Sequence, residues 1–213
     1  MVTIHFVRHG QTNYNAERRV QGQFDSVLTE AGILQAQQLQ PTISKLGITA
    51  AWSSSNVRAR HTAEILVKGL PLELECRDDL REIFMGEWQH RYWSEVEEND
   101  GEQFRYFMTE PDRFQVEGCE TFEELQTRGV AAVEDIIRAE SESEEVIEGQ
   151  VLIVSHGAIL KAILGYYANV PLGKIWSEPG LQNCSHSVMT ATPDGERDVV
   201  SIAGESVVGT IWA

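Results

Sequence analysis

The stretch VTIHFVRHGQT, residues 2–12, determines how the rest of the chain is interpreted. It begins as an apolar, β-branched run, which is typical of a strand buried in a sheet. The run stops at Arg8 and His9, two polar side chains, and then at Gly10, whose backbone is the most permissive. A rigid buried strand that ends in this way is suited to placing polar side chains in a crevice.

A second stretch has the same form. Residues 151–155, VLIVS, are again an apolar strand, and they end at His156 and Gly157 before a helical pattern. In an open α/β sheet, ligands bind beyond the carboxyl ends of the strands. We therefore expect His9 and His156 to face one crevice at this end of the sheet.

Strands and helices alternate along the chain. We expect strands at residues 2–7, 48–55, 72–77 and 151–155, followed by two strands joined by a turn at 193–195. We expect helices at residues 28–40, 56–70, 121–145 and from 157 onward. Thr29 is a predicted N-cap, and Thr121 with Glu124 forms a predicted capping box. This alternation predicts an α/β protein with a parallel-rich sheet covered on both faces.

The alternation is interrupted over residues 83–120. This segment is irregular and rich in aromatic and acidic residues, and we expect it to form an excursion above the sheet. Its aromatic side chains could line an apolar substrate pocket or simply pack the excursion. No low-complexity linker divides the chain, so a single domain spanning residues 1–213 is expected.

Composition and charge exclude several classes of function. The 213 residues are 42% hydrophobic and 23% charged, which is typical of one globular domain. The net charge of −16 argues against nucleic acid or an anionic membrane surface as a partner. An anionic substrate must therefore be captured by local positive charge.

Cysteine usage and hydropathy suggest the compartment. Cys76, Cys119 and Cys184 are an odd number of widely separated residues without a CxxC pair, so neither a disulfide framework nor a zinc knuckle is predicted. The N-terminus lacks the pattern of a signal peptide, and no apolar run is long enough to span a membrane. We expect a cytoplasmic location.

Five polar residues are expected at the crevice. They are Arg8, His9, Arg58 at the start of the second helix, Glu82 after the third strand, and His156. Guanidinium groups disfavour a metal site, and no HxH or HxxxH spacing occurs, so no metal is expected. Arginine matches phosphate oxygens well, and the helix N-termini at residues 56 and 157 are expected to point free N–H groups at an anion.

These side chains suit phosphoryl transfer. A histidine can act as a nucleophile toward phosphorus and form a covalent intermediate. The transition state is anionic, so Arg8, Arg58 and His156 would stabilise it. Glu82 would donate a proton to the leaving alkoxide and then act as a base for water.

The sequence resembles the histidine phosphatase superfamily, the phosphoglycerate mutase-like proteins. The resemblance rests on ordered blocks over essentially the whole chain, which are VRHGQTNYNAERRVQGQFDSVLTEAGILQA, WSSSNVRARHTAEI, LREIFMGEW, GCETFEELQTR, VLIVSHGAIL and LQNCSHSV. It implies a three-layer α/β/α sandwich with a mostly parallel central sheet and a small helical cap insertion at about 83–120. It further implies that His9 is phosphorylated, that Arg8, Arg58 and His156 form the phosphate pocket, that Glu82 is the proton donor, and that no metal or cofactor is needed.

The resemblance also implies a set of substrate-binding residues, which are Gln11, Thr12, Asn15, Gln21, Gly22 and Gly157. Gln11 and Thr12 are expected beside the phosphate site. Asn15 has a second interpretation, as a loop residue that bonds to its own backbone. His90 and Cys119 stand where relatives often have glycine, in positions that could alter the cap and the pocket rim.

The branch of the family is decided by departures from the mutase pattern. Mutases of this family have an arginine directly after the acid and a tyrosine two residues further on, where this chain has Ile83 and Met85. Neither can pair with a second anionic group, so hydrolysis of a small-molecule phosphomonoester is the predicted activity. A phosphoglycerate mutase and a non-catalytic protein that binds a phosphorylated ligand are the alternatives. The substrate and the choice between monomer and homodimer stay open.

Overall fold

The computed structural model describes residues 1–141 and 149–207. They contain a seven-stranded sheet in the order β3-β2-β4-β1-β5-β6-β7. The strands are β1 (Val2–Arg8), β2 (Ala50–Ser54), β3 (Leu74–Arg77), β4 (Gly149–Ser155), β5 (His186–Ala191), β6 (Arg197–Ile202) and β7 (Glu205–Ser206). Parallel pairing joins β3, β2, β4 and β1, and antiparallel pairing adds β5, β6 and β7. The predicted parallel sheet centre is confirmed, whereas the two-residue β7 was not predicted.

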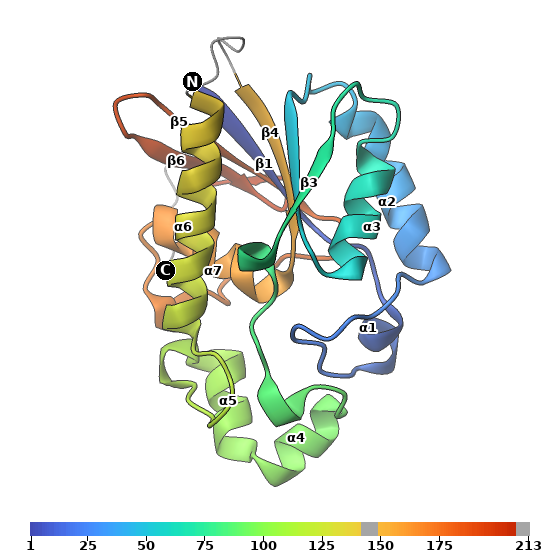
Figure 1. Ribbon diagram of the computed structural model, residues 1–213. Coiled ribbons are helices and arrows are strands. Elements are labelled where there is room, and N and C mark those ends of the chain that lie inside the picture. The colour runs from blue at the N-terminus through green and yellow to red at the C-terminus, as the bar shows by residue number, and fades with distance from the viewer. Residues whose placement is uncertain (142–148, 208–213) are drawn as a thin grey trace.

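Helices cover both faces of the sheet. The longer helices are α2 (Glu30–Ile43), α3 (Val57–Leu66), α6 (Phe122–Ser141) and α7 (Gly157–Tyr167). In Figure 1, α2 and α3 lie on one side of the strands, and α6 and α7 lie on the other. No helix in the described part of the chain is long and apolar enough to cross a membrane. The α/β/α sandwich is confirmed.

Strand β1 contributes to two separate hydrophobic cores. Ile4 and Phe6 pack in the core under α6 and α7, whereas Val7 packs in the core under α2 and α3. Because successive side chains of a strand point to opposite faces, a strand covered on both faces needs apolar residues at nearly every position. This requirement explains the unbroken apolar run that opens the chain.

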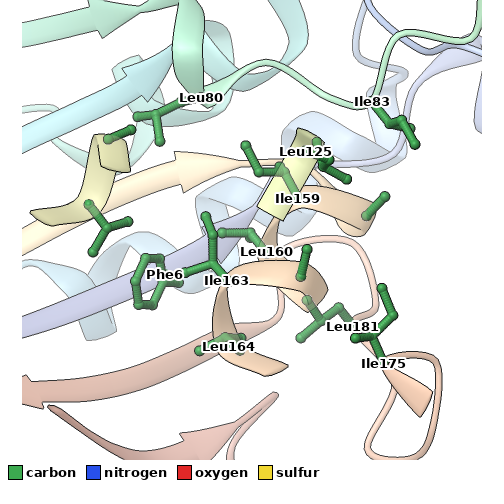
Figure 2. Close-up of a cluster of buried hydrophobic side chains, with 14 of the residues drawn as sticks. Phe6, Leu80, Ile83, Leu125, Ile159, Leu160, Ile163, Leu164, Ile175 and Leu181 are labelled. Carbon is green, nitrogen blue, oxygen red and sulfur yellow. The ribbon is translucent and has the colours of Figure 1, made fainter. Parts of the chain in front are cut away.

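The larger core reaches the end of the sheet. Figure 2 shows Phe6 of β1 packed among Leu160, Ile163 and Leu164 of α7. Ile83 and Leu181 belong to the same buried cluster. The core therefore continues from the middle of the sandwich to the loops beyond the strands.

Local capping fixes where the helices begin. Thr29 accepts a hydrogen bond from the Gly32 N–H at 3.1 Å, as an N-cap does. Thr121 and Glu124 bond to each other's backbone N–H groups at 2.8 and 3.2 Å, which confirms the predicted capping box. The predicted helix over 121–145 is confirmed to Ser141, and most of its acidic end lies outside the described residues.

One helix lies where only a loop was predicted. Helix α1 (Asn13–Glu17) begins after Thr12, which forms a capping box with Asn15. A five-residue helix is too short to show a 3.6-residue periodicity, so its capping residues were the only local signal.

The cap insertion consists of short helices. They are η2 (Gly86–Trp88), α4 (Trp93–Asn99), α5 (Gly101–Thr109) and η3 (Pro111–Arg113). Figure 1 shows α4 and α5 beyond the end of the sheet, away from the chain's N-terminus. Phe107 packs against Phe114 and against Phe122 of α6 with 5.3 Å between ring centroids in each pair. Aromatic packing therefore attaches the cap to the core.

His90 connects the cap to the loop after α1. Its φ of 73° lies in the region that favours glycine. Its ring centroid lies 3.8 Å from that of Phe24, and its Nδ1 lies 2.7 Å from the Tyr14 hydroxyl. These contacts compensate for an unfavourable backbone conformation and position the loop that carries Phe24.

A histidine pair, His5 buried and His186 partly exposed, crosses from β1 to β5. The His5 Nε2–H donates to Gln150 Oε1 at 2.8 Å, so His5 Nδ1 accepts from His186 Nε2–H at 2.9 Å. Burial, followed by the neighbouring His5, lowers the pKa of His186 to about 4. Burial also lowers the pKa of His5, against the opposing effect of its hydrogen bond to Gln150.

The free energy of unfolding is expected to fall as the pH is lowered from 6.5 to about 4. The unfolded chain binds protons at these histidines from about pH 6.5, whereas folded His186 binds one only near pH 4. The partly exposed His186 should account for about 1–2 kcal/mol of this loss. Urea unfolding at pH 8, 6 and 5 measures it. His186→Gln, whose amide can still donate to His5, should flatten the dependence, and an unchanged slope would contradict the assignment.

Candidate active site

A cavity of about 320 Å³ lies beyond the carboxyl ends of β1 and β4, between the start of α7 and the cap. One part of its wall carries residues that the sequence predicted for the site, which are Arg8, His9, Asn15, Gln21, Gly22, Arg58, Glu82 and Gly157. The structure therefore brings together residues from four distant parts of the chain. Parallel strands bring them to one edge of the sheet because their carboxyl ends point the same way.

A hydrogen bond from Nδ1 to the Gly10 carbonyl orients the His9 ring and leaves Nε2 with a lone pair. The residue is 2% exposed, and Nδ1 lies 2.7 Å from the Gly10 carbonyl, so Nδ1 carries the proton and donates it. Nε2 then has a lone pair, and the Arg58 Nε–H donates to it at 3.3 Å. Burial, and then the charges of Arg58 and Arg8, hold the pKa of His9 well below its ordinary value. The ring is therefore neutral, as a nucleophile must be.

The backbone beside His9 depends on two glycines. A Cβ on Gly10 would lie 2.5 Å from the Gly32 carbonyl oxygen, and a Cβ on Gly32 would lie 2.1 Å from the Gln11 carbonyl oxygen. The loop after β1 thus runs directly against the start of α2. The His9 N–H donates to the Ser155 carbonyl of β4 at 2.9 Å, which fixes His9 to the sheet.

Arg58 is buried at the start of α3, where the residue is 1% exposed. Its Nη1 donates to the Phe24 carbonyl at 2.8 Å, and its Nη2 donates to the Gly22 carbonyl at 2.7 Å. Burial lowers its pKa to about 10, so the group stays charged at neutral pH. The loop of residues 22–24 therefore holds a cation against His9.

Arg8 supplies a second, partly buried cation. Its Nη1 donates to the Leu181 carbonyl at 2.6 Å, and its buried Nε has no partner among the described residues. Arg19 and Lys161 also line the cavity, whereas Glu82 is the one acidic side chain in its described lining. The local positive charge that an acidic protein needs to capture an anion is therefore present.

Glu82 lies at the N-terminus of α7. Its Oε1 accepts from the N–H groups of Ile83 and Ile159 at 3.0 and 3.1 Å, and its Oε2 accepts from the Ala158 N–H at 3.0 Å. The N–H group of Val57 at the start of α3 donates to Asp25 Oδ1 at 3.0 Å. We predicted that the starts of α3 and α7 present free N–H groups to an anion. This prediction was wrong for Val57, Ala158 and Ile159, because the carboxylates of Asp25 and Glu82 accept hydrogen bonds from their N–H groups.

His156 lies behind His9 and is not among the side chains that line the cavity. Its ring is fully buried, with 5.2 Å between its centroid and that of His9. Nε2 lies 2.7 Å from the Ser54 hydroxyl, and Nδ1 has no partner in the described structure. Burial and then Arg58 hold the pKa of His156 well below its ordinary value. The two histidines are thus brought together as neutral rings.

Gln11 and Thr12 do not line the cavity. Gln11 accepts from the Thr29 hydroxyl at 2.9 Å, and Thr12 donates its hydroxyl hydrogen to Gln21 Oε1 at 2.8 Å. Asn15 lines the cavity and also accepts from the Thr12 N–H at 3.1 Å, so both interpretations of Asn15 fit its position. Gln11 and Thr12 shape the loop, and their contact with a substrate stays a prediction.

Trp176 and Lys161 in the cavity wall were not predicted, whereas Trp93 and Phe107 belong to the cap aromatics for which a substrate pocket was one of two interpretations. Trp93, Phe107 and Trp176 form an aromatic surface, and the Trp176 Nε1–H donates to the Phe107 carbonyl at 2.6 Å. Lys161 of α7 donates to the carbonyls of Ser177 and Pro179 at 2.7 and 3.1 Å, and burial lowers its pKa to about 8. A lone lysine inside the apolar run GAILKAIL was the signal that could have identified it.

No group of three or more His, Cys, Asp or Glu side chains that could hold a metal ion occurs over residues 1–141 and 149–207. The described arrangement combines the neutral imidazole of His9, the guanidinium groups of Arg8 and Arg58, and one carboxyl group around a single cavity. Such a set can bind a phosphate group, attack it, and move a proton.

Comparison with known protein families and with curated relatives agrees with this geometry. The family model of the histidine phosphatase superfamily (branch 1) matches residues 4–202. A protein of Salmonella enteritidis PT4 named probable phosphoglycerate mutase GpmB is 33% identical over 189 residues, which are 88% of this chain and 84% of that protein.

Solved structures share the fold over nearly the whole chain. Bacillus stearothermophilus YhfR is 31% identical with a TM-score of 0.89, covering 96% of this chain and 98% of that one. A mycobacterial glucosyl-3-phosphoglycerate phosphatase is 25% identical with a TM-score of 0.84, covering 93% of this chain and 97% of that one.

Proposed function

Because this chain belongs to the histidine phosphatase superfamily, we propose that it hydrolyses small phosphomonoesters through a phosphohistidine at His9. One observation carries the proposal most directly. The unprotonated Nε2 of His9 lies 3.3 Å from the Arg58 guanidinium at the wall of a cavity rich in positive charge. A phosphate group bound there would meet a nucleophile and a countercharge together.

The reaction proceeds in two displacements. His9 Nε2 attacks phosphorus, the bond from phosphorus to the ester oxygen breaks, and Glu82 gives that oxygen a proton. Glu82 then takes a proton from water, which attacks the phosphohistidine and releases phosphate. Arg8 and Arg58, which line the cavity, stabilise the negative charge that spreads over the phosphoryl oxygens. His156 does not line the cavity, and its predicted part in the phosphate pocket requires a phosphoryl oxygen to reach its Nδ1, which has no partner among the described residues.

Glu82 can carry the required proton where it lies. A carboxylate has about four lone-pair sites, and three N–H groups bond to Glu82. Oε2 accepts one of these bonds and Oε1 accepts the other two, so a proton fits on Oε2. Glu82 also lines the cavity, where a leaving oxygen would lie.

Hydrolysis is favoured over isomerisation by the residues that follow Glu82 in the cavity wall. Ile83 and Met85 line the cavity and are almost fully buried, so this side offers no charge to hold a second anionic group. The relatives named probable phosphoglycerate mutase keep that activity as the second candidate.

Phosphate release from several monoesters, 4-nitrophenyl phosphate among them, is expected to continue when a chelator is present. With 3-phosphoglycerate and added bisphosphoglycerate, we expect phosphate release to exceed isomerisation. Measuring both products in one incubation decides between the candidates. Rapid isomerisation with little phosphate release would make the protein a mutase, and silence over a broad panel would favour a non-catalytic role in binding a phosphorylated ligand.

We further propose that the protein works in the reducing cytoplasm. Cys76, Cys119 and Cys184 are all free thiols. Burial is the main cause that raises the pKa of Cys119 and of Cys184 to about 11, so neither is a reactive thiolate at neutral pH.

A further inference from the structure

Arg128 of α6 makes five hydrogen bonds outside the catalytic cavity. Nε and Nη2 donate to the two carboxylate oxygens of Glu120 at 2.6 and 2.9 Å. Nη1 donates to the carbonyls of Asp79 and Arg81 at 2.9 and 2.8 Å, and Nη2 donates to the Glu82 carbonyl at 3.0 Å. A guanidinium has five N–H groups, so every donor of Arg128 has an acceptor.

The three carbonyls belong to the segment that carries the proposed acid. This segment runs from the short turn η1 (Asp78–Leu80) into the cap and has no regular hydrogen-bonded structure around Glu82. Its conformation therefore depends on side chains that reach its backbone. Gln23 Nε2 also donates to the Glu82 carbonyl, at 3.1 Å, but the bonds to Asp79 and Arg81 come from Arg128.

Glu120 extends the same network to the base of the cap. Its Oε2 accepts from the Phe84 N–H at 3.0 Å, and its own N–H donates to the Phe84 carbonyl at 2.8 Å. Phe84 and Glu120 stand near the two ends of the cap insertion. Arg128 and Glu120 thus join α6, both ends of the cap and the Glu82 segment.

Lysine could not replace this arrangement. The Arg128 and Glu120 side chains are 23% and 14% exposed, so their paired contact is largely shielded from water. A guanidinium is a rigid planar fork, whereas an ammonium is a point charge with three donors on a flexible stem. The substitution Arg128→Lys would keep the charge but lose most of the bonds to the Glu82 segment.

We propose that Arg128 is a positioning residue that holds Glu82 where it can protonate the leaving oxygen. The inference rests on the proposed role of Glu82 as the acid. Arg128 acts through the backbone of residues 79–82, while the N–H groups of Ala158 and Ile159 hold the carboxyl group itself.

A change at Arg128 should lower kcat/KM by different factors for different classes of phosphate ester. An alkyl phosphate has a strongly basic leaving alkoxide that needs a proton, whereas 4-nitrophenolate leaves without one. Misplacing Glu82 should therefore slow alkyl esters much more than the aryl ester. A general loss of folding or of phosphate binding would slow both substrates equally.

The experiment compares Arg128→Lys with the wild type on glycerol phosphate and on 4-nitrophenyl phosphate. We expect the ratio of kcat/KM for the alkyl ester to that for the aryl ester to fall about tenfold or more. Arg138→Lys is the matched control, because Arg138 lies on the same helix with a 65% exposed side chain. It should leave the ratio unchanged. Glu82→Gln should lower the ratio at least as much as Arg128→Lys.

Two outcomes overturn the inference in different ways. If Glu82→Gln lowers the ratio and folded Arg128→Lys slows both substrates equally, Arg128 is only structural while the proposed acid stands. If Glu82→Gln leaves the ratio unchanged, the acid assignment fails and the inference fails with it. If Arg128→Lys does not fold, Glu120→Gln tests the inference instead. This variant keeps Arg128 but removes the carboxylate that orients its guanidinium group, so it should also lower the ratio.

Discussion

Replacement of His9 by alanine is expected to abolish hydrolysis, with kcat/KM falling by about four orders of magnitude or more. The reason is geometric as well as chemical. His9 is fixed through its Nδ1–H to the Gly10 carbonyl, and its neutral Nε2 faces Arg58. No other neutral imidazole is among the described residues that line the cavity. Without His9, bound phosphate would meet two guanidinium groups and no nucleophile.

The measurement is covalent labelling together with steady-state kinetics. Wild-type protein quenched during turnover of a ³²P-labelled monoester should carry a phosphoryl group whose P–N bond breaks in acid and survives in base. The His9→Ala variant should carry none. His61→Ala is the control, because His61 of α3 is not among the residues that line the cavity. Full activity in folded His9→Ala would exclude His9 as the nucleophile.

Replacement of Arg58 by methionine is expected to lower kcat/KM about a thousandfold. Arg58 is a buried cation held by the Gly22 and Phe24 carbonyls, so it is already oriented before a substrate arrives. Methionine keeps much of the volume and removes the charge and every donor. The Gly22 and Phe24 carbonyls would also lose their partner, so some of the loss should reflect a less ordered loop.

The same variant should change the pH dependence of kcat/KM. Burial is the main cause of the low pKa of His9, and the Arg58 charge is the next. Removing that charge should raise the pKa of His9, so protonation should inactivate the nucleophile at a higher pH than in the wild type. The acidic limb should therefore move upward. Arg60→Met is the control, because Arg60 lies on the same helix with a 60% exposed side chain. It should change neither kcat/KM nor the pH at which the acidic limb lies. An unshifted limb in Arg58→Met would mean that burial alone sets the pKa of His9.

The sequence predicted the sheet centre well because strand burial leaves a local signal. A strand that packs against helices on both faces must be apolar at nearly every position, and β1 and β4 both show this in their sequences. The N-caps at Thr29 and Thr121 were predictable for the same reason, since a cap bonds to residues three positions away.

Structures without a local period were missed. Helix α1 spans little more than one turn, and β7 has two residues, so neither shows a repeat. For Trp93 and Phe107 the sequence does not separate a pocket wall from internal packing, because packing and substrate binding select the same apolar residues.

The sequence by itself determined which chemical groups stand at strand and helix ends. Arg8 and His9 after one buried strand, and His156 after another, implied a single crevice without any knowledge of distance. Only the tertiary structure decided how these groups face one another. In the folded chain, the Arg58 Nε–H donates a hydrogen bond to His9 Nε2, and Glu82 accepts from an N–H group of α7. Arg128 donates to the Glu82 carbonyl. The physical reason is that burial and capping act between near neighbours, whereas these contacts join residues 46 to 76 positions apart and leave no repeat in the chain.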